Sequence, residues 1–485
     1  MHAHDTKLHY HCDDWMNDPK LFFWEGEYHV FFQYKWPRHW GHVKSRDLLH
    51  WEELPVALTP DPVPHEAMGC WTGCCVRANG QFHIFYTAAS TDERQVTCHA
   101  TSDDLITWHK DPANPILAAS APYNSAPRNA WRDPCVWRHE DTWYMAQCAE
   151  VGTNVKNAVT GCIALMKSRD LKHWEMLPPL HVSDGMMMCE CPDIFPLDGK
   201  WAGLFGCHKP FSIVSDAMLG KYRLNPHAAQ VDGDVFYAGK TLLDDKGRRI
   251  LWGFLFDYCG FEFYFERWKN FLSGRAWTNA LSFPRVLSFT EKGELASRFP
   301  EEFLRLRKKE IAWSLGNSAG HWRAEGNTAA GAPENDFAWA MLNNVQSDCF
   351  EITAKVKLNG AKKAGFLVRC NEGLVEDATG IFVCGQTRSV WIENLGGGLD
   401  APRTRLWDAF YTSPSLSVST PVTDGVETAV ELRIIVDVSV IEVCVNNKAF
   451  LTGRCYPKKD SLSAGMFAVS GAAVFEEVRV WELGL

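Results

Sequence analysis

One sequence motif occurs three times before residue 175 and restricts the folds that this chain can adopt. Each copy contains a short run of aromatic and β-branched residues, then Ser-x-Asp-Leu, then a tryptophan three residues later; the copies span residues 28–51, 82–108 and 143–174. Strand-like runs at this spacing, separated by a recurring turn motif, indicate a radial repeat in which four-stranded blades bury their faces against each other.

Two more segments begin like these repeats but lack the tryptophan signature. They are glycine-led, strand-like runs at residues 199–205 and 247–253. Together with the three complete copies, they predict five blades. We therefore expect a five-bladed β-propeller over residues 1–290.

The sequence changes character after the predicted propeller. Residues 291–312 contain a charged run without the blade pattern, which predicts a linker. Residues 313–485 contain strand-like segments in which apolar and polar side chains alternate, as in a sheet with one buried face. Asn446 and Asn447 follow one such segment and favour a tight hairpin turn. We expect a β-sandwich here, and hence an all-β protein of two domains.

The charge balance argues against partners that need a basic surface. The formal net charge is −10 at pH 7, and the charges are spread along the chain rather than grouped in blocks. We expect neither nucleic acids nor anionic membranes as partners, because binding to either depends on clustered Lys and Arg side chains.

The N-terminus and the cysteines predict the cellular compartment. No apolar run after Met1 is typical of a signal peptide, and the 17 cysteines include no C-x-x-C pair. We therefore expect mostly reduced thiols and a cytoplasmic protein. His2, His4, His9 and His11 are expected to lie in a solvated N-terminal segment rather than to bind a metal ion.

Three acidic residues stand in similar, partly apolar surroundings. Asp18 lies in Trp-Met-Asn-Asp-Pro, Asp133 in Trp-Arg-Asp-Pro and Glu190 in Met-Cys-Glu-Cys-Pro-Asp. An isolated Asp-Pro pair is most often the start of a turn. Two further acids in similar surroundings argue against a turn as the only role of Asp18.

These three contexts, in this order, resemble glycoside hydrolase family 32, which contains invertases, inulinases and levanases. The resemblance covers nearly the whole chain and implies hydrolysis or transfer of a β-fructofuranosyl group. Other segments that follow the family's order are Trp40-Gly41-His42, Trp51, Leu251-Trp252-Gly253 and residues 277–285, and residues 431–457 resemble its C-terminal sandwich module.

Each of the three acids has an expected role. Asp18 is expected to be the nucleophile, and Glu190 the general acid and base, with a pKa raised by its apolar and sulfur neighbours. Asp133 resembles the family's transition-state stabiliser, kept ionised by Arg132. In a retaining enzyme the nucleophile and the acid lie about 5 Å apart. The structural alternatives are a capped turn for Asp18, a salt bridge for Glu190, and an ion pair of Arg132 with Asp133 that links blades.

Further side chains around these acids are expected to form a sugar pocket. Asn17 is expected to fix the rotamer of Asp18 with a hydrogen bond, and Cys191 to hydrogen-bond to Glu190 or pack against it. No metal or organic cofactor is expected, because carboxylate chemistry on an acetal needs none. The predicted substrate-binding set, which includes residues matched to the family's fructose pocket, is Asn17, Gln33, Trp40, Trp71, Thr72, Arg132, Cys191 and Trp277.

Departures from the family pattern leave the second substrate open. Lys20-Leu21 stands where Asn-Gly is usual, and Trp71-Thr72-Gly73-Cys74 where Phe-Ser-Gly-Ser is usual. The aromatic segment 261–268 is expected to cover either the pocket mouth or another subunit of a homo-oligomer.

Three interpretations of the function follow from these features. The first is a retaining β-fructofuranosidase that hydrolyses sucrose or short fructans through a covalent fructosyl-enzyme intermediate. The second is a fructosyltransferase, including an intramolecular one that forms a difructose anhydride. The third is a catalytically silent, sugar-binding propeller, which the presence of all three acids disfavours.

Overall fold

The computed structural model describes residues 5–123, 130–152, 159–224, 231–233, 235–256, 279–371, 377–396, 416–418, 429–455 and 457–485. The aromatic segment 261–268 and Trp277 lie outside the described residues. In the described part of the chain, none of the helices has the length and apolar character needed to cross a bilayer. Two compact units are present: Tyr10–Val231 with Phe236–Leu295, and Met1–His9 with Asp232–Val235 and Ala296–Leu485. The boundaries expected at residues 290 and 313 stay a prediction.

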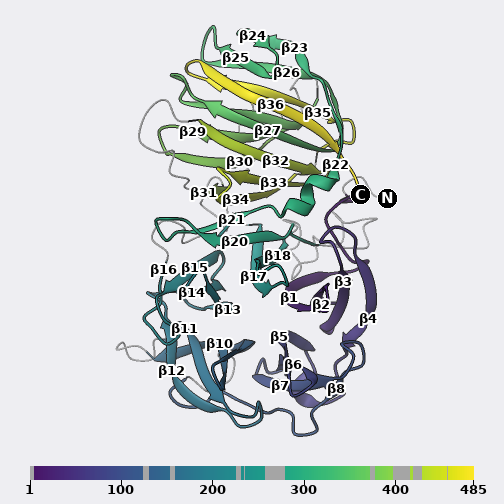
Figure 1. Cartoon of the computed structure of the whole chain (residues 1–485), viewed down its shortest axis with the longest axis vertical. Helices are drawn as coiled ribbons and strands as arrows, with labels where there is room; N and C mark the ends of the chain where they lie inside the picture. Colours follow the sequence, from purple (N-terminus) through teal and green to yellow (C-terminus); the bar gives the residue numbers. More distant parts are fainter. Residues whose placement is uncertain are drawn as a thin grey trace. The chain divides into compact units, whose positions relative to one another are not determined.

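The first unit is a β-propeller, as the repeats predict, with its sheets arranged around a common centre (Figure 1). In the described residues, four blades are four-stranded sheets and the fifth sheet has five strands. Blade 1 contains β1 (Met16–Trp24), β2 (Glu27–Tyr34), β3 (His39–Ser45) and β4 (Glu52–Leu58). Blade 2 contains β5 (Cys70–Ala78), β6 (Gln81–Ala89), β7 (Gln95–Ser102) and β8 (His109–Lys110), with the short 3-10 helix η1 (Pro64–Glu66) before it.

The remaining three blades continue the same order along the chain. Blade 3 contains β9 (Trp131–His139), β10 (Thr142–Gly152), β11 (Val159–Ser168) and β12 (Glu175–Val182). Blade 4 contains β13 (Glu190–Leu197), β14 (Lys200–Gly206), β15 (Pro210–Ser215) and β16 (Arg223–Leu224). Blade 5 contains β17 (Phe236–Leu243), β18 (Arg249–Leu255), β19 (Ala280–Leu281), β20 (Arg285–Phe289) and β21 (Leu295–Arg298).

The repeated Ser-x-Asp-Leu motif is a turn that its own side chains stabilise. In the first copy, Ser45 Oγ accepts the backbone N–H groups of Asp47 and Leu48 at 3.2 and 2.9 Å. Asp47 Oδ1 accepts the next two N–H groups, at 3.1 and 2.9 Å. Short Ser and Asp side chains suit this geometry because they reach nearby backbone donors. The leucine takes a left-handed backbone in every copy, with φ of 67° at Leu48, 64° at Leu105 and 65° at Leu171.

The tryptophan after each turn packs against the second strand of the preceding blade. Such edge-to-face aromatic contacts are favourable beyond the area they bury. Because the tryptophan of blade 1 covers blade 5, side-chain packing closes the ring. The pairs, with the distance between ring centroids, are Trp108 and Phe31 at 6.0 Å, Trp174 and Phe85 at 5.8 Å, and Trp51 and Trp252 at 6.2 Å.

The second unit is a sandwich of two antiparallel sheets, which also confirms its prediction. The first sheet contains β22 (Arg307–Glu310), β24 (His321–Glu325), β25 (Thr328–Ala332), β27 (Cys349–Lys357), β32 (Val430–Asp437), β33 (Val440–Val445), β34 (Ala449–Arg454) and β36 (Ala473–Leu483). The second contains β23 (Ser314–Ala319), β26 (Phe337–Gln346), β28 (Lys363–Cys370), β29 (Asp377–Cys384), β30 (Ser389–Gly396), β31 (Leu416–Val418) and β35 (Ser463–Val469). The 3-10 helix η3 (Glu301–Leu306) precedes β22.

The predicted hairpin at Asn446 and Asn447 is present between β33 and β34. Both residues have positive φ, 51° and 53°, which Asn tolerates better than most residues. Local turn chemistry therefore sets the register of this strand pair.

The expectation of a solvated N-terminal segment is wrong for His9. Its side chain is fully buried within the sandwich unit, with Nδ1 2.7 Å from Asp437 Oδ2 and Nε2 3.2 Å from Glu442 Oε1. Asp437 also accepts the backbone N–H groups of Lys7, Leu8 and His9 at 2.8 to 3.0 Å. Charge pairing, which the histidine-rich sequence did not reveal, thus anchors the segment to β32 and β33.

Burial and charge have opposite effects on the pKa values of His9 and Asp437. Burial alone would lower the pKa of His9, but the hydrogen bonds and charges of Asp437 and Glu442 outweigh it and raise the pKa. Burial would raise the pKa of Asp437, yet His9 and the backbone donors hold it below its ordinary value. Because both ring nitrogens contact carboxylate oxygens, the cluster favours the imidazolium form of His9.

This cluster should make the stability of the sandwich depend on pH. The raised pKa of His9 gives a contribution that is complete below its unfolded value, about pH 6.5, and is lost as the pH rises through the folded pKa. The lowered pKa of Asp437 gives one that is present above about pH 4 and lost as the pH falls further. His9→Gln should cost on the order of 3 to 5 kcal/mol, because it removes a buried cation that contacts two buried carboxylates.

Calorimetric unfolding from pH 4 to 9 tests this expectation. In the wild type, the transition temperature of the sandwich should decline above pH 6.5. In the His9→Gln protein, this decline should be absent. His173→Gln is the matched control, because His173 also contacts an aspartate, Asp170, at 2.7 Å but is 90% exposed. Equal pH profiles for wild type and His9→Gln would contradict the assignment.

Candidate active site

The first strand of every blade is interrupted by a bulge near its start. In Figure 1, β1, β5, β13 and β17 lie next to the centre of the propeller, so these bulges belong to the innermost strands. The register shifts fall between Asn17 and Lys20 in β1, Cys70 and Gly73 in β5, Glu190 and Asp193 in β13, Tyr237 and Lys240 in β17, and opposite Ala146 to Cys148 in β9.

The local sequence explains why the strands bulge there. The backbone is left-handed at three bulge residues, with φ of 41° at Asp18, 62° at Asp133 and 49° at Cys191. A proline follows each of them, and outside the ladder a residue without an N–H group loses no strand hydrogen bond. In blade 2 the bulge lies at Trp71 and Thr72, where no proline follows, and at the next residue, Gly73, a Cβ would lie 1.9 Å from the carbonyl oxygen of Phe85.

Asp18 is held by side chains from two blades. Its Oδ2 accepts hydrogen bonds from Gln33 Nε2 at 3.0 Å and from Thr72 Oγ1 at 2.5 Å. Both donors are buried, whereas Asp18 itself is half-buried. Because both contacts use the same oxygen, they fix the orientation of the carboxylate. The hydrogen bond expected from Asn17 is replaced by these two, and Asn17 Oδ1 instead accepts Asn279 Nδ2 at 2.6 Å.

Asp133 is the most buried of the three acids. Its Oδ2 accepts the backbone N–H of Cys191 at 2.9 Å and lies 3.6 Å from Arg132 Nε. Burial raises the pKa of Asp133 above its ordinary value; the charge of Arg132 opposes this, and the charges of Asp18 and Glu190 add to it. The three acids of blades 1, 3 and 4 therefore lie within electrostatic reach of one another.

Glu190 lies between a cation and a phenol. Its Oε1 accepts Arg132 Nη2 at 2.6 Å, and its Oε2 accepts the hydroxyl of Tyr237 at 2.5 Å. Burial, with the charge of Glu190, raises the pKa of Tyr237, so the phenol stays protonated and can donate. The side chain of Glu190 keeps 26% of its surface exposed, so solvent or a ligand can reach it.

Arg132 joins two of the acids. It contacts Glu190 and Asp133, and its Nη1 donates to Gln95 Oε1 at 3.4 Å. The ion pairs that were the structural alternatives for Glu190 and Asp133 are thus present. They hold the two carboxyl groups in place at the site.

The predicted aromatic residues differ in their exposure. Trp40 is completely buried, and its Nε1 donates to the carbonyl oxygen of Trp71 at 2.8 Å. This hydrogen bond indicates that Trp40 stabilises the backbone of β5. Trp71 is half-buried, and its ring lies 4.3 Å from the Arg38 guanidinium. Cys191 contributes its backbone N–H to Asp133. Trp277 lies outside the described residues.

Arg38 lies among three tryptophans at the entrance to β3. Its guanidinium is 5.6, 5.1 and 4.3 Å from the ring centroids of Trp15, Trp36 and Trp71. Trp36 is 58% exposed. The backbone of Arg38 forms a bridge with Gly69 before β5, so the cluster is joined to blade 2.

Sequence reasoning missed Tyr237, Gln95 and Asn279. No acid marks any of these positions, and their contacts depend on which strands become neighbours around the axis. One signal could have identified Tyr237: like Glu190 it stands next to a left-handed bulge residue, Ala238, with φ of 50°.

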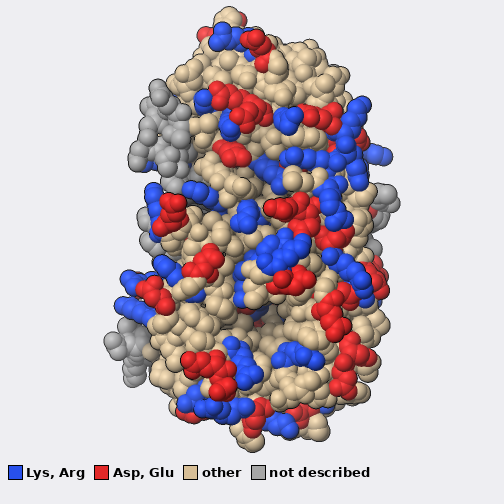
Figure 2. All heavy atoms as spheres, in the orientation of Figure 1, with Lys and Arg blue, Asp and Glu red and all other residues tan. Residues whose placement is uncertain are grey.

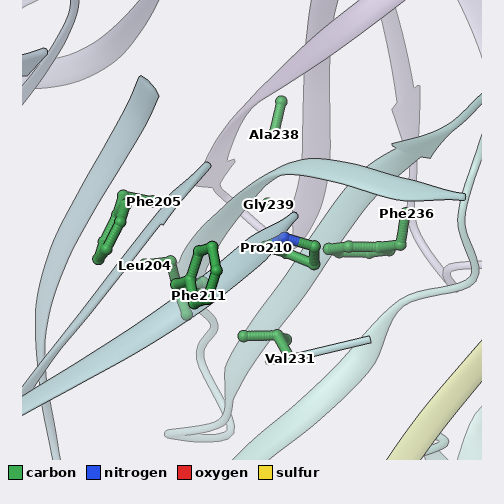
Figure 3. A pocket seen from close by; sticks show the side chains of 8 residues that line it. All are labelled: Leu204, Phe205, Pro210, Phe211, Val231, Phe236, Ala238 and Gly239. Carbon is green, nitrogen blue, oxygen red and sulfur yellow. The ribbon is translucent and has the colours of Figure 1, made fainter. Parts of the chain in front are cut away.

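A separate hollow between blades 4 and 5 has no chemistry of its own. Figure 3 shows the apolar side chains that line it, and none of them carries a charged or hydroxyl group. Its lining residues are Leu204, Phe205, Pro210, Phe211, Val231, Phe236, Ala238 and Gly239. The polar cluster around Asp18, Asp133 and Glu190 is therefore the candidate site.

Comparison with known sequences agrees with this geometry. Residues 9–298 match the sequence model of the glycosyl hydrolases family 32 N-terminal domain, and residues 320–482 match that of the family 32 C-terminal domain. The chain belongs to glycosyl hydrolase family 32. The acids that form the cluster thus lie in the catalytic fold of a family of glycoside hydrolases.

Several family 32 relatives align over most of the chain. A sucrose-6-phosphate hydrolase of Zymomonas mobilis is 29% identical, over 97% of this chain and 90% of the relative. A raffinose invertase of Escherichia coli is 28% identical, over 97% and 93%. The structure of fructan 1-exohydrolase IIa from Cichorium intybus in complex with 1-kestose aligns with a TM-score of 0.78 and 21% identity, covering 99% of this chain and 98% of that one. This likeness shows the shared fold.

Removal of the Thr72 hydroxyl should weaken the hold on Asp18. A hydrogen bond to a charged group contributes about 1.5 to 3 kcal/mol. Thr72→Val should therefore lower kcat/KM by roughly 10- to 150-fold. Steady-state kinetics with sucrose test this expectation. Thr160→Val is the control, because it removes a propeller hydroxyl that bonds to the carbonyl oxygens of Ser183 and Met186. Equal losses in both variants would show that general destabilisation is the cause.

Proposed function

We propose that the protein is a retaining β-fructofuranosidase that hydrolyses sucrose or short fructans through a covalent fructosyl-enzyme intermediate. The observation that carries this proposal is the gathering of three acids from different blades, each with its own hydrogen-bond donors, at one site. The names of the relatives, sucrose-6-phosphate hydrolase and raffinose invertase, support a fructosyl donor such as sucrose.

The first half of the reaction forms the intermediate. Asp18, oriented by Gln33 and Thr72, attacks the anomeric carbon of the fructosyl group as the bond to the leaving oxygen breaks. Glu190 gives its proton to that oxygen, while Arg132 and Tyr237 hold the glutamate in place. Positive charge builds on the anomeric carbon and the ring oxygen, and nearby carboxylates stabilise it.

The second half releases fructose. Glu190, now ionised, removes a proton from water, and the water oxygen attacks the anomeric carbon. The bond to Asp18 breaks, and both acids return to their starting states. Asp133 fits the remaining role, in which a carboxylate binds the fructosyl hydroxyls without attacking.

A fructosyltransferase is the second candidate, and the aromatic cluster at Arg38 is the observation that favours it. The exposed ring of Trp36 beside Arg38 and Trp71 is a platform on which an acceptor sugar can stack. A sugar hydroxyl would then replace water in the second half-reaction. Chromatography of products from sucrose, inulin and levan separates hydrolysis from transfer, including formation of a difructose anhydride. Release of no sugar at all would instead favour a silent binding propeller.

We also propose that the enzyme works in the cytoplasm. The 16 cysteines that the structure describes are free thiols, and most are buried. On the face shown in Figure 2, acidic and basic side chains are interspersed, which gives that face no continuous basic area for nucleic acid or anionic lipid.

Loss of either catalytic carboxyl group should remove most turnover. Asp18→Asn and Glu190→Gln should each lower kcat on sucrose by roughly 10²- to 10⁴-fold or more, because an amide neither attacks nor donates a proton. A p-nitrophenyl β-fructofuranoside, whose leaving group needs no proton, should restore the first half-reaction in Glu190→Gln but not in Asp18→Asn. The surface variants Asp216→Asn and Glu175→Gln are the controls. Near wild-type turnover in either site variant would refute the assignment.

The double displacement should retain the configuration at the anomeric carbon. Retaining enzymes place the two carboxyl groups about 5 Å apart, whereas inverting enzymes leave about 6.5 to 9.5 Å for a water molecule. NMR of the first product should show β-fructofuranose before mutarotation. First release of the α-anomer from a β-fructoside would rule out Asp18 as the nucleophile.

A further inference from the structure

Lys20 is a buried lysine two residues after Asp18 on β1. Only 1% of its surface is exposed, and among the described residues its Nζ has no hydrogen-bond partner. The ammonium lies 4.6 Å from the ring centroid of Trp40. A buried cation without a hydrogen bond is costly, so another interaction must explain its place beside the active site.

Charged and titratable groups on four inner strands act electrostatically on Lys20. They are Asp18 on its own strand, Asp133 on β9, Cys191 on β13 and Lys240 on β17. Burial raises the pKa of the Cys191 thiol, so this group is uncharged near neutral pH. Lys240 has a partner of its own, because its Nζ donates to the carbonyl oxygen of Pro192 at 2.6 Å. Asp18 and Asp133 are thus the carboxylates whose charges act on Lys20, and among the described residues Lys20 Nζ hydrogen-bonds to neither.

Burial and nearby charges have opposing effects on the pKa of Lys20. Burial lowers the pKa of Lys20 to about 7, and the charges of Asp18 and Asp133 oppose this decrease while Lys240 adds to it. Burial and the charges of Asp18 and Glu190 also raise the pKa of Asp133. A nearby positive charge favours the ionised form of a crowded carboxylate, and its effect is large where water is excluded.

We propose that Lys20 is a positioning residue of this enzyme, whose buried ammonium keeps Asp18 and Asp133 ionised so that one can attack and the other can bind the fructosyl group. Lys20 acts through these acids and does not touch the substrate. The inference rests on the roles proposed for Asp18 and Asp133. It also gives a function to Lys20-Leu21, one of the departures from the family's usual sequence.

The pH dependence of kcat/KM tests the proposal. Removal of the positive charge favours protonation of the carboxylates and raises their pKa, so the acid limb of the profile should move to higher pH. For Lys20→Met and Lys20→Gln we expect a shift of about one pH unit, which is a tenfold loss of kcat/KM at a pH on the wild-type acid limb. Lys20→Arg keeps the charge and should leave the limb near its wild-type position.

A matched control separates this effect from loss of a lysine as such. Lys44→Met removes the same charge from blade 1, but Lys44 is partly exposed and pairs with Glu27 at 3.2 Å. Its acid limb should not move. If Lys20→Met and Lys20→Gln fold, as circular dichroism and thermal unfolding report, and their acid limbs match the wild type, the proposal is wrong. In that case the roles of Asp18 and Glu190 stand, because Asp18→Asn and Glu190→Gln test them separately.

A measurement on the wild-type protein covers the case in which no Lys20 variant folds. Aspartate labelled with ¹³C at Cγ gives carboxyl signals that Asp18→Asn and Asp133→Asn identify. Each signal should show its own titration and a second inflection near pH 7, where Lys20 loses its proton. Absence of the second inflection in both signals would overturn the proposal.

Discussion

The bulge in the first strand of each blade is the constraint on which the active site depends. A regular ladder would alternate side chains between the two faces of each sheet and would keep the backbone N–H groups in strand pairing. The bulge releases that pairing at one point in each blade. It turns Asp18, Asp133 and Glu190 toward a common axis and frees the N–H of Cys191 for the carboxylate of Asp133. The position of the site and its polar groups therefore both follow from the bulge that each blade repeats.

The same arrangement creates a problem of charge. Three carboxyl groups lie within electrostatic reach of one another, and in the described residues Arg132 is the cation in direct contact with two of them. Neutral hydroxyl groups donate further hydrogen bonds: Thr72 donates to Asp18, and Tyr237 donates to Glu190. A neutral donor orients a carboxylate without cancelling the charge that the reaction needs. Each acid therefore has a different set of partners, although the three act on one another electrostatically.

Much of the fold could be read from short-range patterns. The Ser-x-Asp-Leu turn and its tryptophan are local, so they mark the blades directly, and Asn446 with Asn447 marks a hairpin by the backbone that Asn tolerates. The three acids carry a second local signal in the proline or apolar residues beside them. The partners of these acids were harder to find, because they come from other blades: Tyr237 donates to Glu190 from blade 5, and Gln95 of blade 2 accepts from Arg132. His9 was misread for the same reason: its partners lie more than 400 positions away in the chain.

The tryptophan packing also bears on how the chain folds during synthesis. Blades 1 and 2 each receive a tryptophan from the blade that is made next, so each lacks this aromatic contact until the following blade is made. Trp51 is the exception, since it is among the first residues made and its partner Trp252 is among the last of the propeller. Domains generally fold as units as the chain leaves the ribosome. Closure of this propeller must therefore wait for blade 5, and until then Trp51 lacks its contact with Trp252.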